Sequence, residues 1–213
     1  MQPQPLESPA GTTGTTGKIA TRLWAAARSE FAVRGYHGAR VQGIARRAGC
    51  NVALLYRHWA SKRALYLEIL RSIWVGNSRQ VVSALAEGSG PRSVVNAYLE
   101  ARLADPEASQ ILVREYLDGA PFLHELHAAD ASIADPLRAA AETLQQGNGH
   151  SLRKGVDPQL AVFTIGAVAA LAAAAHRTAD PFYDGPPLER PDWKRHLEDM
   201  LLHGLEECSD ARS

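Results

Sequence analysis

The chain has 213 residues, of which 46% are apolar, and its formal net charge is zero. This length suits one regulatory-sized unit or two small domains and excludes a large multidomain enzyme. A chain of this size buries most of its apolar surface without help from disulfides or metals. The two cysteines, Cys50 and Cys208, lie outside any CxxC spacing, which excludes a disulfide scaffold and a thiolate zinc site.

The first seventeen residues have no basic start and no apolar stretch, so they are not a signal peptide. They are rich in Pro, Gly and Thr and lack periodicity, which predicts a disordered lead over residues 1–17. No apolar run approaches the roughly eighteen residues that a membrane span needs. We therefore expect a cytoplasmic protein without membrane contact.

The zero net charge hides two segments of opposite sign. Between Lys18 and Arg63 there are ten Lys or Arg residues and one acid, Glu30, which gives this segment a charge of +9. The rest of the chain carries the balancing −9. A basic block followed by an acidic body is typical of a nucleic-acid-binding head on a body with another role.

The basic head shows the pattern of several helices. Between Ile19 and Arg34, apolar residues recur at steps of three and four, which predicts a helix with one buried face that ends at Gly35. Apolar residues at 41, 44, 45 and 48 predict a second helix of about two turns, closed by Gly49. Asn51 is a good N-cap for a third short helix.

Helices this short are not stable alone, because nucleation costs too much free energy. Two short helices joined by a tight turn that contains Gly, with a longer helix bracing them, form the helix-turn-helix arrangement, whose second helix lies in the DNA major groove. Ser61 caps a fourth helix, and Lys62 in its first turn would bind a DNA phosphate together with the backbone N–H groups there.

Four sequence blocks in the head occur in a specific order and spacing. They are FAVRGY at 31–36, IARRAG at 44–49, LYRHW at 55–59 and SKRALY at 61–66. In these blocks the run from Arg22 to Tyr66 resembles the N-terminal domain of the TetR family of transcriptional regulators. The resemblance implies that a set of side chains on the second and third helices faces DNA while Lys62 grips a phosphate. The residues carried over are Gln42, Val52, Ala53, Leu54, Tyr56, His58 and Lys62.

The head departs from the family pattern on the side that would face DNA. The family usually has Thr or Ser at 40, Asp near 43, and Ser, Lys, Gly and Thr at 51–54, whereas this chain has Arg40, Gly43 and the run Asn51 to Leu54. The predicted groove face is therefore unusually apolar. Base readout would depend on contacts to thymine methyl groups and on the hydrogen bonds of Gln42, Arg40, Tyr56 and His58.

The remainder of the chain is predicted to be helical, with no sustained alternating strand pattern. Breaks at Gly and Pro clusters predict helices over 62–87, 91–104, 106–117, 121–146, 157–177 and 188–207. With the three helices of the head, this makes an all-α protein of about nine helices. We expect a DNA-binding domain over 18–66, a helical ligand-binding and dimerisation domain over 67–208, and a short C-terminal tail over 209–213.

Two body helices have features of an interface. The segment 160–175 has no charged residue and many small side chains, and the last helix has a broad apolar stripe. The resemblance implies that such a pair meets its symmetry mate in a four-helix dimer interface, although both helices could instead only complete the core of one chain. The candidate interface residues are Phe163, Ala167, Ala170, Trp193, Leu197, Leu201 and Leu205.

The resemblance also implies a pocket for a small effector in the helical body. Aromatic side chains between helices suit an apolar ligand, although each could equally be a core residue. The candidate pocket residues are Trp74, Tyr98, Tyr116, Phe122, Phe163 and His176. The family habit then implies a homodimeric regulator, most often a repressor, that binds an inverted-repeat operator in double-stranded DNA and is released by an apolar or amphipathic molecule.

Other chemistry has little support in the sequence. His124 and His127 are the only pair with metal-ligand spacing, and we interpret them as surface or pocket-edge residues. No HExxH, GxSxG, Walker or GxGxxG pattern is present, so we expect no enzyme, no cofactor and no metal. Two alternatives stay open for the body: it docks a protein partner, or it senses a metal through the two histidines.

Overall fold

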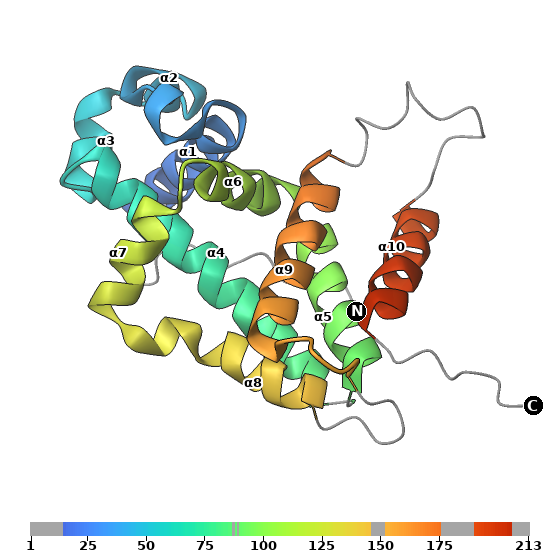
Figure 1. Ribbon diagram of the computed structural model, residues 1–213. Coiled ribbons are helices and arrows are strands. Elements are labelled where there is room, and N and C mark those ends of the chain that lie inside the picture. The colour runs from blue at the N-terminus through green and yellow to red at the C-terminus, as the bar shows by residue number, and fades with distance from the viewer. Residues whose placement is uncertain (1–14, 87, 89, 146–151, 176–189, 206–213) are drawn as a thin grey trace, which may run out of the picture. The chain divides into compact units, whose positions relative to one another are not determined.

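A computed structural model describes residues 15–86, 88, 90–145, 152–175 and 190–205. Over these ranges the chain forms ten α-helices and one 3-10 helix, with no strand, so the all-α prediction is confirmed (Figure 1). The chain divides into two units, which are described separately. Unit 1 consists of residues 1–76 and 110–130, and unit 2 of residues 77–109 and 131–213.

Unit 1 contains the basic head, the first part of the helix that follows it, and residues 110–130 from later in the chain. Its elements are α1 (Thr15–Gly38), α2 (Val41–Arg47), α3 (Val52–His58), the first part of α4 (Lys62–Leu85), the end of α6 (Pro106–Leu117) and α7 (Pro121–Ala129). The predicted apolar stripe of the first helix is buried, with Leu23, Ala27 and Phe31 fully inaccessible. Gly35 interrupts α1 as expected, since its φ of 66° and ψ of 178° are not helical. The helix begins at Thr15, three residues before the predicted start of the ordered head.

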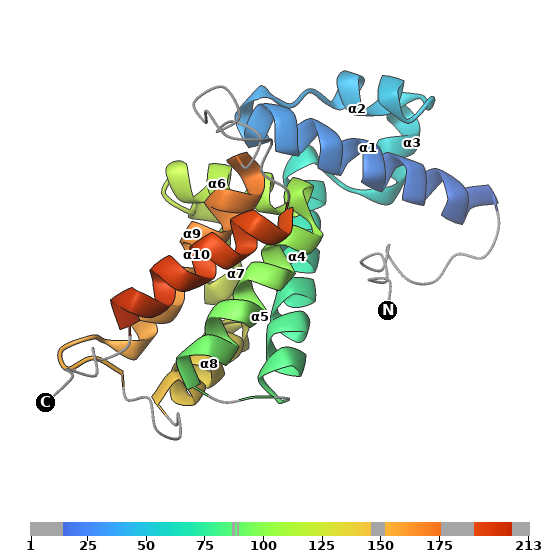
Figure 2. The same cartoon turned by 90° about the vertical axis from the view of Figure 1, so that its right-hand side faces the viewer.

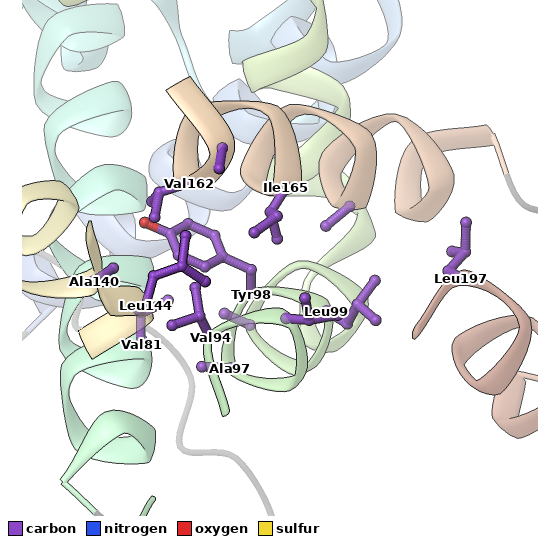
Figure 3. Close-up of a cluster of buried hydrophobic side chains, with 14 of the residues drawn as sticks. Val81, Val94, Ala97, Tyr98, Leu99, Ala140, Leu144, Val162, Ile165 and Leu197 are labelled. Carbon is purple, nitrogen blue, oxygen red and sulfur yellow. The ribbon is translucent and has the colours of Figure 1, made fainter. Parts of the chain in front are cut away.

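Unit 2 is a bundle around one apolar core. Its elements are the end of α4, α5 (Gly90–Ala104), the start of α6, a 3-10 helix (Ala131–Ala134), α8 (Asp135–Gln145), α9 (Pro158–Ala175) and α10 (Arg190–Leu205). α9 packs on α5 and α8, and α10 packs on α5 (Figure 2). Figure 3 shows Tyr98 of α5 pointing toward α9 beside Val162 and Ile165.

The single helix predicted over 121–146 is wrong. The structure has α7 up to Ala129, a 3-10 turn, and α8 from Asp135, so the described part of the chain contains ten α-helices rather than nine. The chain leaves the helical conformation at Asp130, whose φ of −151° and ψ of 97° are extended, and Pro136 lacks the N–H group that one continuous helix would need at that position. It is well placed in the first turn of α8, where its missing N–H costs nothing.

The expectation that no apolar run reaches the length of a membrane span is also wrong. α9 is 18 residues long with a mean hydropathy of 1.8, and 39% of it is buried inside the chain. Its buried residues, among them Val162, Ile165 and Ala169, pack into the core of unit 2. A helix that packs into a protein core can be as long and as apolar as a helix that crosses a membrane, so length and hydropathy do not distinguish the two.

Gly166 allows α9 to approach the ring of Tyr98, and this contact can be tested. A Cβ atom at position 166 would lie 3.1 Å from the ring. We expect Gly166→Val to lower the free energy of unfolding by about 1–3 kcal/mol, the usual cost of overpacking a core. Ala174→Val, on the same helix at a half-buried position, is the control and should cost only about 0.5 kcal/mol of helix propensity. Urea denaturation measures both; equal costs would mean that the Tyr98 contact does not restrict position 166.

Candidate DNA-binding site

The turn between α2 and α3 is held by a side chain of α1. The guanidinium of Arg22 donates to the backbone oxygen of Ala48 and, at 3.2 Å, to that of Gly49. Gly49 has a φ of 60°, and a Cβ atom there would lie 2.7 Å from the Arg22 guanidinium. The predicted glycine is therefore required twice, by the left-handed backbone and by the bound arginine. Sequence reasoning counted Arg22 only as a positive charge.

α3 has one inward-facing residue in its centre and an exposed outer side. Asn51 caps the helix as predicted, because its side chain accepts from the N–H of Ala53 at 2.6 Å. Leu55 is fully buried and anchors the helix against α1 and α2. The helix ends at His58, and the ring of its C-cap residue Trp59 packs 6.3 Å from that of Trp24 while the Trp59 ring N–H donates to Glu68 at 2.7 Å.

The structure leaves the predicted base-reading side chains accessible. Tyr56 is 51% exposed, Gln42 and Ala53 are also exposed, and Val52, Leu54 and His58 are half-buried. Only Leu55 among the seven residues of α3 is buried. The accessible surface of α3 thus combines the apolar Val52, Ala53 and Leu54 with the polar Tyr56 hydroxyl, the exposed Arg57 and His58.

Lys62 has partners that sequence reasoning did not predict. Its ammonium donates to the backbone oxygens of Tyr36 at 2.8 Å and Ala39 at 3.1 Å, and it lies 4.4 Å above the Tyr36 ring. These carbonyl groups lie after the bend in α1, near its C-terminal end. The negative end of the helix dipole is there, and it favours a cation. Two of the three N–H bonds of the ammonium are directed at the protein in this way, and the predicted phosphate contact stays a prediction.

Arg114 of α6 binds the backbone near the end of α1, within unit 1. Its guanidinium donates to the backbone oxygens of Ala32 at 2.8 Å and Val33 at 2.6 Å. The Cδ atom of Arg114 lies 3.6 Å from where a Cβ atom on Gly35 would be. The bend at Gly35 therefore exposes two carbonyl groups to a cation 82 residues along the chain.

The neighbouring Glu115 forms a buried centre of hydrogen bonds. Its carboxylate is 2% exposed and accepts from the hydroxyl of Tyr66 at 3.1 Å and from the N–H groups of Phe122 and Leu123 at 2.7 and 3.0 Å. A backbone reversal at Gly119 and Ala120, whose φ angles are 84° and 58°, brings the start of α7 back to this carboxylate. Burial, followed by the charge of Glu115, raises the pKa of Tyr66 far above its ordinary value.

An aromatic cluster surrounds this carboxylate. The ring of Phe122 lies 4.5 Å from that of Tyr36 and 4.9 Å from that of Tyr66, and Phe31 lies 4.9 Å from Tyr66. Phe122 was predicted as a pocket residue, but it packs against α1 and α4 within unit 1. Through these contacts Phe122 packs α7 against α1 and α4.

The other candidate pocket residues are divided between the two units. Trp74 and Tyr116 are half-buried in unit 1, whereas Tyr98 is buried in the core of unit 2 against Gly166. Phe163 is 51% exposed on α9. His176 lies outside the described residues. The periodicity of an all-apolar stretch could not distinguish core, surface and pocket positions.

The candidate interface residues also separate into two groups. Ala170, Leu197 and Leu205 are 0%, 9% and 8% exposed, so their own chain covers most of their surface, and their predicted place in a dimer interface stays a prediction. Trp193 and Leu201 are half-buried and pack against that core. Phe163 and half-buried Ala167 lie on the accessible face of α9. That face also carries Leu160 and Leu171, which are 68% and 55% exposed and which sequence reasoning missed.

His124 and His127 are both exposed on α7. Within the part of the chain that the structure describes, no group of three or more His, Cys, Asp or Glu residues is arranged to hold a metal ion.

Comparison with known proteins agrees with this geometry. The family model described as "Bacterial regulatory proteins, tetR family" matches residues 23–69. The HTH-type transcriptional regulator RutR of Escherichia coli K12 is 30% identical over 171 residues, which cover 73% of this chain and 77% of RutR. The chain belongs to the TetR family. It is therefore a DNA-binding transcriptional regulator and not an enzyme, as the sequence predicted.

Solved structures of TetR-like regulators share its fold. The ketosteroid transcriptional regulator KstR2 of Mycobacterium tuberculosis has a TM-score of 0.65 at 21% identity, covering 95% of this chain and all of KstR2. A regulator from Saccharomonospora viridis in complex with choline has a TM-score of 0.61 at 21% identity, covering 88% of this chain and 97% of its own.

The buried Tyr66 hydroxyl predicts a specific dependence of stability on pH. Because its pKa is raised in the folded state, its contribution is complete below the ordinary tyrosine pKa of about 10 and is lost as pH rises above it. Tyr66→Phe should cost about 2 kcal/mol at pH 7, since the hydroxyl binds a charged acceptor, and less as pH approaches 11. Urea denaturation between pH 7 and 11 measures this, with Tyr56→Phe at an exposed hydroxyl as the control. A cost that stays constant over this range would contradict the buried hydrogen bond.

Proposed function

We propose that the protein is a homodimeric, ligand-responsive repressor that binds an inverted-repeat operator and releases it when a small apolar or amphipathic molecule enters the helical body. The observation that carries the proposal is the construction of α3. Leu55 anchors the helix on its buried side and Arg22 binds the turn before it, while Tyr56 and Ala53 are exposed. A short helix held so firmly with a free outer face suits insertion into a major groove.

The chemistry of that face limits how it reads bases. Val52, Ala53 and Leu54 offer apolar contacts to thymine methyl groups, and Gln42 can form a pair of hydrogen bonds to adenine. The sequence of the operator therefore depends on few polar contacts, and we expect A·T-rich half-sites.

An accessible apolar stripe supports the homodimer. Leu160, Phe163 and Leu171 follow one face of α9 and are 51% to 68% exposed, and Met200 of α10 is 61% exposed. A groove of about 350 Å³ separates Leu160 from Met200 at the junction of the two helices. A second copy covering this stripe would bury it symmetrically and provide the two heads that successive half-sites, roughly 34 Å apart, require.

Release by an effector follows if the ligand prefers a body conformation in which the heads no longer match successive major grooves. The regulator from Saccharomonospora viridis, a protein of this fold, is in complex with choline, a small organic cation. The alternatives are a body that docks a protein partner and a body that senses metal through His124 and His127. A thermal-shift screen of metabolites and metal ions separates the three, since a ligand at 100 times its Kd adds about 2.7 kcal/mol to stability.

Selection from a random duplex library at about 0.15 M salt tests the proposed function as a whole. We expect an enriched inverted repeat, which also provides the probe for an effector screen. Binding without any enriched motif, fading uniformly as salt rises, would replace the sequence-specific repressor by a non-specific DNA-binding protein.

Tyr56 tests the assignment of α3 as the recognition helix. Tyr56→Ala should weaken operator binding by about tenfold, because it removes a hydrogen bond to a base edge, worth about 0.5–1.5 kcal/mol, together with the contacts of the ring. The fold should be unaffected, because the side chain is 51% exposed. Fluorescence anisotropy measures the affinity, and Tyr56→Phe shows whether the hydroxyl or the ring makes the contact. Wild-type affinity in both variants would exclude Tyr56 from the DNA interface.

Substitutions in the apolar stripe on α9 and α10 test the proposed dimer interface. A double variant, Leu160→Lys with Met200→Lys, should sediment as a monomer and lose most of its operator affinity, because it places like charges in an apolar interface. Leu117→Lys, at a residue 82% exposed in unit 1, is the matched control and should stay dimeric. An unchanged sedimentation coefficient in the double variant would place the interface on another surface.

A further inference from the structure

A cleft of about 800 Å³ lies between α1 and α2. It is lined by four arginines, Arg34, Arg40, Arg46 and Arg47, together with Glu30, Gly38, Gln42 and Gly43. Four guanidinium groups and one carboxylate give the cleft a net charge of +3. Like charges held together repel one another, and an anion in the cleft would offset that repulsion.

Glu30 organises two of the arginines from below. It is 5% exposed, and its carboxylate binds Arg34 of its own helix at 2.9 Å and Arg47 of α2 at 3.7 Å. A Cβ atom at Gly43 would lie 3.0 Å from this carboxylate, so the glycine leaves space for Glu30 to reach beneath α2. The departure from the family pattern at position 43 thus has a physical reason.

The other two arginines face outward. Arg40 and Arg46 are exposed, and neither forms an ion pair with a carboxylate in the described ranges of the chain. Gln42, a member of the predicted DNA-facing set, lines the same cleft. The cleft is therefore continuous with the surface that carries the candidate base-reading residues.

The shape of this cluster favours a polymer of phosphates over one small anion. Arg40 and Arg47 are seven residues apart, so the arginines extend about 10 Å along α2. DNA presents one charge for each 3.4 Å of axis per strand, and the fork of a guanidinium matches the oxygens of a phosphate. A single small anion would instead need donors that converge on one point.

We propose that this arginine cleft binds consecutive phosphates of the DNA backbone beside the bases that α3 reads. The inference rests on the proposed DNA-binding function and adds a second contact surface to it. Arg46 and Arg40 bind the backbone directly, and Glu30 positions Arg34 and Arg47 for the same strand. The cleft strengthens binding to any duplex and sets the register of α3, without reading sequence itself.

The test compares Arg46→Ala and the double variant Arg40→Ala with Arg46→Ala against the wild-type protein, using anisotropy with the selected operator and a random duplex. Arg138→Ala, which removes a comparably exposed arginine from unit 2, is the matched control. We expect the slope of log K against log salt to fall by about 0.9 for each arginine removed per bound subunit. Both duplexes should lose affinity by the same factor, and the control should match the wild type.

Phosphate-ethylation interference then locates the contact. We expect Arg46→Ala to lose dependence on one group of neighbouring phosphates while the enriched bases stay the same. An unchanged salt slope, or a loss confined to the operator, would overturn the proposal. Stabilisation of the DNA-free protein by inorganic pyrophosphate, lost in Arg46→Ala while DNA binding is unchanged, would overturn it in favour of a small-anion site. Failure of the wild-type protein to bind any duplex would instead refute the proposed function before the variants are compared.

Discussion

The buried carboxylate of Glu115 is the interaction on which unit 1 depends. A charged group removed from water is costly unless donors replace its hydration. Three donors do so here, from Tyr66 of α4 and from the first N–H groups of α7. The same bonds satisfy backbone groups that a helix start leaves without partners. One side chain of α6 therefore binds both α4 and α7. Its hydrogen bonds to α7 offset the strain of the left-handed turn at Gly119 and Ala120.

Consecutive residues of α6 bind different partners, which gives the end of this helix an unusual influence on the head. Glu115 binds α4 and α7, while Arg114 binds two carbonyl groups of α1. A rotation or translation of the end of α6 cannot preserve both sets of bonds. Both α4 and α6 cross a boundary between the two units, at residues 76–77 and 109–110, so each helix contributes residues to both units.

The sequence predicted what depends on local chemistry. Asn51, Ser61 and Gly49 act as the caps and turn that their residue types indicate, and the buried stripe of α1 follows its periodicity. The partners of Lys62 and Arg114, and the bond between Tyr66 and Glu115, were not predictable, because these bonds join residues 23 to 82 positions apart. Which charges meet across such distances is decided by packing, and no pattern in the sequence records it.

The covered and accessible sides of α9 were not predictable for a different reason. A helix without charged residues has no polar face, so its periodicity cannot show which side is covered by its own chain. Ala170 and Phe163 looked equivalent in the sequence, yet one is buried and the other is half exposed. Small residues such as Gly166 mark the buried side, because they admit the ring of Tyr98.

The composition of the head has a consequence for how the protein recognises DNA. The part of the α3 surface that Val52, Ala53 and Leu54 form can distinguish thymine by its methyl group but offers no side-chain hydrogen bond to base edges. Affinity must then come mainly from phosphates, which every sequence provides equally. Discrimination between operators would depend on placing a weakly selective helix in one register only. The rigid elements behind it, Arg22 on the turn and Glu30 beneath α2, are what make such a register possible, because a mobile head with the same side chains would bind DNA without selecting a site.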